Sequence, residues 1–121
     1  MKFSPEMAQY AQDALFHKAL ALIGPKRADY SGSADPFANF RSSETIGVEA
    51  WRGAMVRWLD KIQRMRQLAE KGGTGEVKSE SLIDTAADAL NYCAITLALI
   101  IESLPEENAQ RMLTALDFPA T

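Results

Sequence analysis

The sequence predicts an all-α fold: a four-helix bundle-like domain with a long ordered loop between the first and second helices. Apolar residues recur at helical spacing in four segments, and no segment alternates apolar and polar residues over the length of a strand. Glycine and proline mark several borders of these segments, as at Gly24–Pro25 and Gly72–Gly73, where helices usually end. A length of 121 residues suits one domain, so we expect residues 1–121 to form a single helical domain.

The first helix is expected over residues 4–25. Ser4 precedes Pro5 and Glu6, which is the order of an N-cap, a first-turn proline and a first-turn acidic residue. Gly24 and Pro25 are expected to end this helix, because glycine and proline commonly follow a helix C-terminus.

An irregular loop is expected over residues 26–47, with at most one helical turn in the segment "PFANF". Loops of this length inside a compact domain are uncommon and are usually functional or disordered. The aromatic residues and the proline in this loop indicate that it packs against the domain. They are Tyr30, Pro36, Phe37 and Phe40.

The remaining helices are expected over residues 47–73, 79–104 and 103–116. The second has an apolar stripe that includes Trp51, Trp58 and Ile62, and Gly72–Gly73 closes it. The third is apolar nearly all round in its second half, "CAITLALII", which is typical of a helix buried on several sides or at a subunit interface. This run is about half the length that spans a bilayer, so we expect no membrane segment. Its apolar surface predicts that subunits associate there as a homo-oligomer, either a dimer or a closed ring.

Charge and cysteine content narrow the functional classes. The net charge is −3, which disfavours general nucleic-acid binding, since such proteins are usually basic. Eight of the 13 Lys and Arg residues fall within residues 26–66, whereas eight of the 16 Asp and Glu residues fall from residue 76 onward. The single cysteine, Cys93, forms no intrachain disulfide and suits a reducing cytoplasm.

The sharpest polar pattern lies on the third helix. Glu80, Asp84, Asp88 and Asn91 recur at i, i+4, i+8 and i+11, and fall within roughly 80° of arc on a helix. Stacked carboxylates repel one another, and together with an amide they are ligands suited to Mg²⁺ held partly through substrate phosphates. The alternative is an ordinary solvated polar face, which is the more common origin of such a stripe.

A second polar pattern lies on the second helix, where Arg57, Lys61 and Arg64 surround Asp60. Arginine forks bind phosphate bidentately and lysine acts as a point charge, so this pattern suits a phosphate group. The alternative is again a solvated face joined by i,i+3 and i,i+4 pairs. Both functional interpretations depend on the two polar faces meeting.

The loop offers a third group of candidates. Lys26, Arg27 and Arg41 are potential phosphate contacts, and Asn39 is suited to reading the edge of a base. Tyr30, Phe37 and Phe40 are suited to base stacking, which contributes about 1–3 kcal/mol per base. The alternative is that these aromatic side chains close the end of the helical bundle, which is the more frequent role of phenylalanine in a loop.

Three segments together carry a family resemblance: "KRADYSGSADPFANF", "VRWLDKIQRM" and "ESLIDTAADALNY". In this order they resemble a small helical family found largely in bacteriophages, the first of the nucleotide-modification-associated domains, over residues 26–98. The matching positions are Lys26, Asp29, Tyr30, Phe37, Asn39, Phe40, Arg57, Asp60, Lys61, Arg64, Glu80, Asp84, Asp88, Asn91 and Tyr92. The resemblance implies a role in nucleotide metabolism or nucleotide handling during phage infection.

The acidic helix is also distantly similar to the MazG-type all-α nucleoside triphosphate pyrophosphohydrolases. Those enzymes hold Mg²⁺ with two acidic pairs, ExxE on one helix and ExxD on the next. Here the second helix offers only Asp60, and Glu80 precedes Asp84 by four residues rather than three. Two-metal hydrolysis requires several carboxylates converging on the ions, so binding is favoured over hydrolysis by a small margin.

The sequence therefore predicts a cytoplasmic protein, in the host cytoplasm if phage-encoded, that binds a nucleotide or cyclic nucleotide and sequesters a host signalling nucleotide. Phosphate contacts are assigned to Lys26, Arg57, Lys61 and Arg64, base contacts to Tyr30, Phe37 and Phe40, and polar contacts to Asp29, Asn39, Asp84 and Asp88. The second hypothesis is a Mg²⁺-dependent pyrophosphohydrolase whose metal ligands are Asp60, Glu80, Asp84 and Asp88. A third is a purely structural or protein-binding role.

Overall fold

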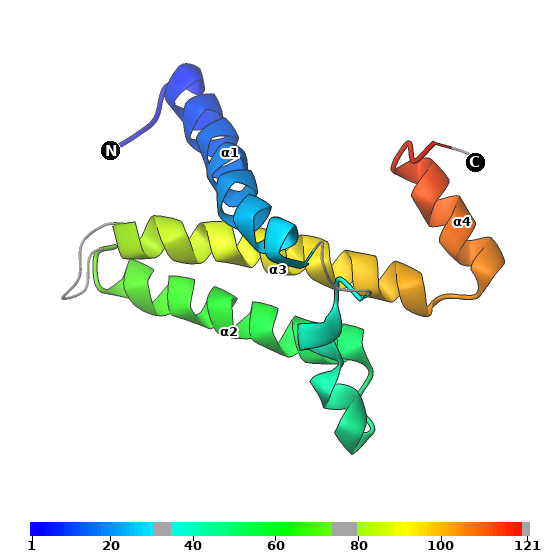
Figure 1. Ribbon diagram of the computed structural model, residues 1–121. Helices are drawn as coiled ribbons and strands as arrows, with labels where there is room; N and C mark the ends of the chain where they lie inside the picture. Colours follow the sequence, from blue (N-terminus) through cyan, green and yellow to red (C-terminus); the bar gives the residue numbers. More distant parts are fainter. Residues whose placement is uncertain (31–34, 74–79, 120–121) are drawn as a thin grey trace.

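The computed structural model describes residues 1–30, 35–73 and 80–119, and for residues 27–30, 80 and 81 it describes the backbone alone. The described residues confirm the all-α, bundle-like fold and contain no strand. The order of elements is α1 (Pro5–Tyr30), the 3₁₀ helix η1 (Ala38–Ile46), α2 (Ala50–Glu70), α3 (Glu80–Ser103) and α4 (Glu106–Ala115) (Figure 1).

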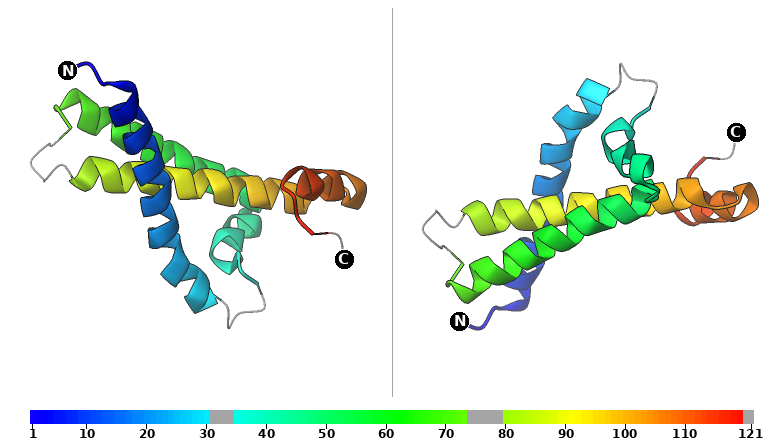
Figure 2. Two further views of the ribbon diagram at one scale, coloured as in Figure 1. Left: turned by 90° about the horizontal axis from the view of Figure 1, so that it is seen from above. Right: turned by 90° about the horizontal axis from the view of Figure 1, so that it is seen from below.

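The frame of the molecule is the antiparallel hairpin of α2 and α3 (Figure 1). Helix α1 crosses α3, and both of its ends extend beyond the hairpin (Figure 2). η1 packs beside the beginning of α2, and α4 contacts the end of α3. Because α3 contacts α1, α2 and α4, it is the central element of the fold.

The core lies where the beginning of α2 meets the second half of α3. Ala50, Ala54 and Leu99 form its buried centre, and the small alanine side chains allow the helices to approach closely. Four half-buried side chains pack around this centre: Phe37, Phe40, Trp51 and Ile95. Phe37 and Phe40 therefore cover the end of the hairpin, as one of the two interpretations of the loop predicted.

The expected end of the first helix at Gly24–Pro25 is wrong, because α1 continues through Pro25 to Tyr30. Proline in a helix interior removes one i→i−4 hydrogen bond. Ala21, Gly24 and Pro25 are all exposed on α1, so solvent is available to the carbonyl group that loses its partner. The beginning of the helix is confirmed, since the backbone N–H of Met7 donates to Ser4 Oγ at 3.2 Å.

The loop after α1 is more regular than expected, because η1 extends the predicted single turn to nine residues. Gly47 ends η1 with a φ of 79°, a left-handed conformation that favours glycine. Gly53 on α2 allows η1 to approach, since a Cβ atom at this position would lie 2.8 Å from Ser43 Oγ.

The expected beginning of the fourth helix at residue 103 is also wrong, because α4 begins at Glu106. Ser103 is the last residue of α3, and its hydroxyl donates to the carbonyl of Ile100 at 2.7 Å. Pro105 occupies the N-cap position of α4 without a side-chain hydrogen bond. The predicted end of the second helix is confirmed, because Gly72 and Gly73 both have positive φ directly after α2.

The apolar part of α3 also bears on membrane insertion. Leu82–Ser103 is long and apolar enough to cross a membrane, with a mean hydropathy of 1.3. One such helix is weak evidence, since a central helix of a soluble protein has the same length and composition. The described part of the chain thus carries no strong signal of a membrane protein.

Candidate functional site

The polar faces of α2 and α3 meet on one side of the hairpin. Lys61 Nζ lies 3.4 Å from Asp88 Oδ2, and both side chains are about one-third exposed, at 35% and 33%. The structure directs Lys61 to α3. The basic pattern of one helix and the acidic pattern of the next therefore contact each other.

Two aromatic residues, Phe40 and Tyr92, lie near this ion pair. The guanidinium carbon of Arg57 lies 5.2 Å from the centre of the Phe40 ring, within cation–π range. Phe40 in turn meets Tyr92 edge to face, with ring centres 6.2 Å apart. We call the five residues Phe40, Arg57, Lys61, Asp88 and Tyr92 the motif junction.

The motif junction joins all three segments that carried the family resemblance. Phe40 comes from η1, Arg57 and Lys61 from α2, and Asp88 and Tyr92 from α3. Arg64 is exposed on the same face of α2, almost two turns after Arg57. Among the described residues, neither Arg57 nor Arg64 has an ion pair within 4.0 Å, so both guanidinium groups are available to an anion.

Other members of the acidic pattern attach α1 to α3. Lys18 Nζ lies 3.2 Å from Asp84 Oδ1, although both side chains are close to half exposed. Asn91 donates from Nδ2 to the carbonyl oxygen of Ala19 at 2.9 Å. Asp84 and Asn91 therefore have structural partners on α1, which sequence spacing alone gave no means of predicting.

The proposed metal ligands stay a prediction. The side chain of Glu80 lies outside the described residues, and Asp60 is exposed on α2. Within residues 1–26, 35–73 and 82–119, no group of three or more His, Cys, Asp or Glu side chains is arranged to hold a metal ion. Asp84 and Asp88 lie one turn apart on α3, and each carboxylate pairs with a lysine. Asp84 pairs with Lys18, and Asp88 pairs with Lys61.

The loop candidates are divided between the core and the surface. Phe37 and Phe40 pack against the core, Asn39 is exposed on η1, and Lys26 is exposed near the end of α1. Asp29 and Tyr30 belong to α1, and their side chains lie outside the described part of the chain. Phe40, one of the proposed base contacts, lies beside the basic face of α2.

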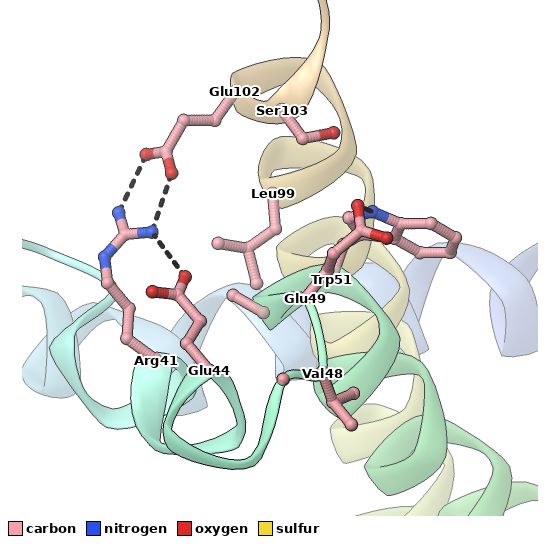
Figure 3. Close-up of a pocket in the computed structure, with 10 residues that line it drawn as sticks. Arg41, Glu44, Val48, Glu49, Trp51, Leu99, Glu102 and Ser103 are labelled. Atoms are coloured by element: carbon pink, nitrogen blue, oxygen red, sulfur yellow. Dashed lines mark hydrogen bonds and ion pairs between the residues drawn. The ribbon is translucent and has the colours of Figure 1, made fainter.

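Arg41, proposed as a phosphate contact, binds carboxylates instead (Figure 3). Its Nη1 lies 2.8 Å from Glu102 and 3.7 Å from Glu44, and its Nε donates to Asp35. Hydrogen bonds to Glu102 and Asp35 raise the pKa of the Arg41 guanidinium. The hydrogen bond from Arg41, followed by that from the Phe37 N–H, lowers the pKa of Asp35. Arg41 therefore ties η1 to the end of α3.

A pocket of about 340 Å³ opens beside Arg41, between η1, the beginning of α2 and the end of α3 (Figure 3). Glu44, Glu49 and Glu102 supply its negative charge, while Val48, Trp51 and Leu99 supply apolar surface. The indole N–H of Trp51 donates to Glu49, and this bond, followed by that from Arg52, lowers the pKa of Glu49. The carboxylates that line the pocket disfavour a phosphate ligand, so the pocket is a poorer anion site than the motif junction.

Comparison of the chain with protein-family models, with curated proteins and with solved structures found no match in any of the three.

Proposed function

We propose that the chain binds a phosphorylated nucleotide at the motif junction and the adjoining basic face of α2. The observation that carries the proposal is the meeting of the three motif segments, in which Arg57 lies over Phe40 and Lys61 pairs with Asp88. A nucleotide joins a flat base to an anionic tail, so it matches a site where aromatic and cationic groups adjoin.

The phosphate groups are assigned to Arg57, Lys61 and Arg64. These residues follow one face of α2 at spacings of four and three residues, which keeps them in line on the helix. Arg57 and Arg64 are exposed, so they can turn toward an anion without breaking a buried contact. Lys61 can exchange part of its attraction to Asp88 for a phosphate oxygen.

The base is assigned to Phe40 and Tyr92, whose edge-to-face arrangement offers an aromatic surface next to Arg57. Phe40 is fixed by its packing on the core, which reduces the entropy lost when a base stacks on it. In the phage setting that the family resemblance implies, the proposed ligand is a host signalling nucleotide, and sequestering it would blunt host defence.

Hydrolysis by a Mg²⁺-dependent pyrophosphohydrolase is the second candidate. The observation in its favour is that Asp84 and Asp88 lie one turn apart on α3, with Glu80 one turn earlier on the same helix. Against it, Lys18 and Lys61 neutralise Asp84 and Asp88, whereas two-metal chemistry needs carboxylates that converge on the ions. Binding is therefore ranked above hydrolysis.

Equilibrium dialysis against mono-, di-, tri- and cyclic nucleotides with Mg²⁺, followed by heat denaturation and chromatography, tests both candidates. Intact ligand in the released fraction supports sequestration, whereas pyrophosphate in the medium supports hydrolysis. Arg64→Gln is expected to weaken binding about tenfold, the loss of one charge-assisted hydrogen bond.

The matched control is Arg66→Gln, because Arg66 lies on the same helix but pairs with Glu70 on another face. This variant is expected to bind as the wild type does. Equal binding by the Arg64 variant and the wild type, or no binding of any nucleotide, would contradict the proposed site. Asp84→Ala abolishes turnover only if the chain is a hydrolase.

A further inference from the structure

An apolar surface runs along the side of the hairpin opposite the motif junction. Lys61 lies on the polar side of α2. Measured around the helix axis from Lys61, Trp58, Leu59 and Ile62 lie at about 60–160°. On α3 the corresponding residues are Cys93, Leu97 and Ile100, about 120–180° from Asp88. We call these six residues the apolar seam.

The apolar seam is open in the single chain. Leu59 is 52% exposed, Ile62 is 42% exposed and Leu97 is 45% exposed. Cys93 is exposed as well, and Trp58 and Ile100 are half-buried. The seam has exposed apolar residues on both helices of the hairpin.

The chain exposes more surface in total than a compact monomer of its mass. The chain exposes 8943 Å², whereas a compact folded monomer of 13.3 kDa exposes about 6,450 Å². The excess of about 2,500 Å² over the whole chain is larger than the roughly 800 Å² that each partner contributes to a standard interface, so the chain has surface enough for a partner. Part of it lies on the projecting end of α1, where Tyr10 and Phe16 are exposed.

We infer that a second copy of this chain covers the apolar seam, so that two hairpins form a four-helix bundle. A two-helix hairpin with apolar side chains along one side becomes a complete bundle core when it meets an identical hairpin about a two-fold axis. Every copy carries the same seam over the same two helices, which makes the chain a self-complementary partner. The two motif junctions then face outward, one on each subunit.

Sedimentation equilibrium tests this assignment. The wild type is expected to have twice the 13.3 kDa chain mass. Ile62→Glu is expected to raise the dissociation constant of the dimer at least about 100-fold, because it places a charge in the apolar interface. Val56→Glu is the matched control, since Val56 is 57% exposed on α2 and lies about 120° around the helix from Ile62. If circular dichroism shows that Ile62→Glu is unfolded, Leu97→Glu on α3 tests the same surface.

Cys93 supplies an independent measurement, because it is the single cysteine and lies in the seam. Its reaction with a thiol reagent is expected to be slow in the wild type and in Val56→Glu, and fast in Ile62→Glu. A wild type that stays monomeric at all concentrations would overturn the inference, as would a dimer in which Cys93 reacts fast. Binding of the monomer to phosphatidylcholine vesicles would likewise overturn it, since lipid would then cover the seam.

Discussion

Asn91 on α3 donates a hydrogen bond from Nδ2 to the backbone carbonyl oxygen of Ala19 on α1, at 2.9 Å. Ala19 is buried at the point where α1 crosses α3, so the Asn91 side chain holds the two helices together at their contact. Asn91 belongs to the motif on which nucleotide handling was predicted, and its observed role is to position α1.

Replacing Asn91 with Asp keeps the size of the side chain but removes the donor and directs a carboxylate at the Ala19 carbonyl. We expect the free energy of unfolding to fall by about 1–3 kcal/mol, the cost of leaving a polar group unsatisfied. Hydrogen exchange of α1 amides should accelerate more than that of α2 amides. Asn108→Asp on the exposed surface of α4 is the control, and equal exchange in α1 for both variants would contradict this role for Asn91.

The contact between Lys61 and Asp88 is measurable by a double-mutant cycle. Lys61→Met and Asp88→Asn each remove one charge, and both side chains are about one-third exposed. Solvent screening limits the expected coupling to about 0.5 kcal/mol of unfolding free energy. Urea denaturation of the four proteins measures this term, and the coupling should shrink at 1 M salt. A coupling of zero at low salt would mean that the two helices do not bring these charges together in solution.

Thr96 is buried, and its hydroxyl has no hydrogen-bond partner within the part of the chain that the structure describes. Thr96→Val removes this polar atom while keeping the shape of the side chain. We expect the free energy of unfolding to rise by about 1 kcal/mol, because the desolvation cost of the hydroxyl disappears. Thermal and urea denaturation should agree on the sign.

Thr85 is the matched control for Thr96, because it is buried on the same helix and does have an interaction partner. Thr85→Val is therefore expected to lower stability, in the opposite direction to Thr96→Val. Destabilisation by both substitutions to the same extent would show that the hydroxyl of Thr96 is satisfied in solution.

The attachment of η1 should weaken in acid. The hydrogen bond from Arg41, together with that from the Phe37 N–H, lowers the pKa of Asp35 below its ordinary value of 3.8. A depressed folded-state pKa means that the stabilisation is fully present above about pH 5 and is lost as the pH falls through 3.8 toward the folded-state pKa. Asp35→Asn removes the titrating group.

The melting temperatures of the wild type and Asp35→Asn should therefore differ by a constant amount from about pH 5 to pH 7. The difference should shrink as the pH falls below 3.8. Chemical-shift titration of the Asp35 carboxyl carbon gives the folded-state pKa directly. A difference in melting temperature that grows in acid would reverse the sign of this linkage.

Much of the secondary structure followed from local sequence. Ser4 determines where α1 begins because its hydroxyl accepts from a nearby N–H, and Gly72 and Gly73 end α2 because they adopt positive φ at low cost. The two wrong helix boundaries have a common reason. α1 continues through Pro25, which is exposed, and Ser103 ends α3 with a hydrogen bond to Ile100. Both outcomes depend on the surroundings of the residue and not on its type alone.

The candidate site was predicted only in part. The sequence indicated Phe40, Arg57, Lys61 and Asp88 as separate candidates, and Tyr92 only through the family resemblance. It also proposed Arg41 as a phosphate contact, whereas three carboxylates from η1, α3 and the preceding segment surround its guanidinium. Periodicity gives the face of a helix on which a residue lies, but it contains no information about which neighbouring element that face meets.

The sequence by itself determined an all-α chain, the order of its helices and the polar and apolar faces of each, because helix formation depends on spacing and capping within a few residues. The tertiary structure alone decided that Lys61 meets Asp88, that Asn91 holds α1, and that Ile62 and Leu97 stay uncovered. These relationships depend on how the helices rotate and cross as they pack, and long-range packing has no local signature in a single sequence.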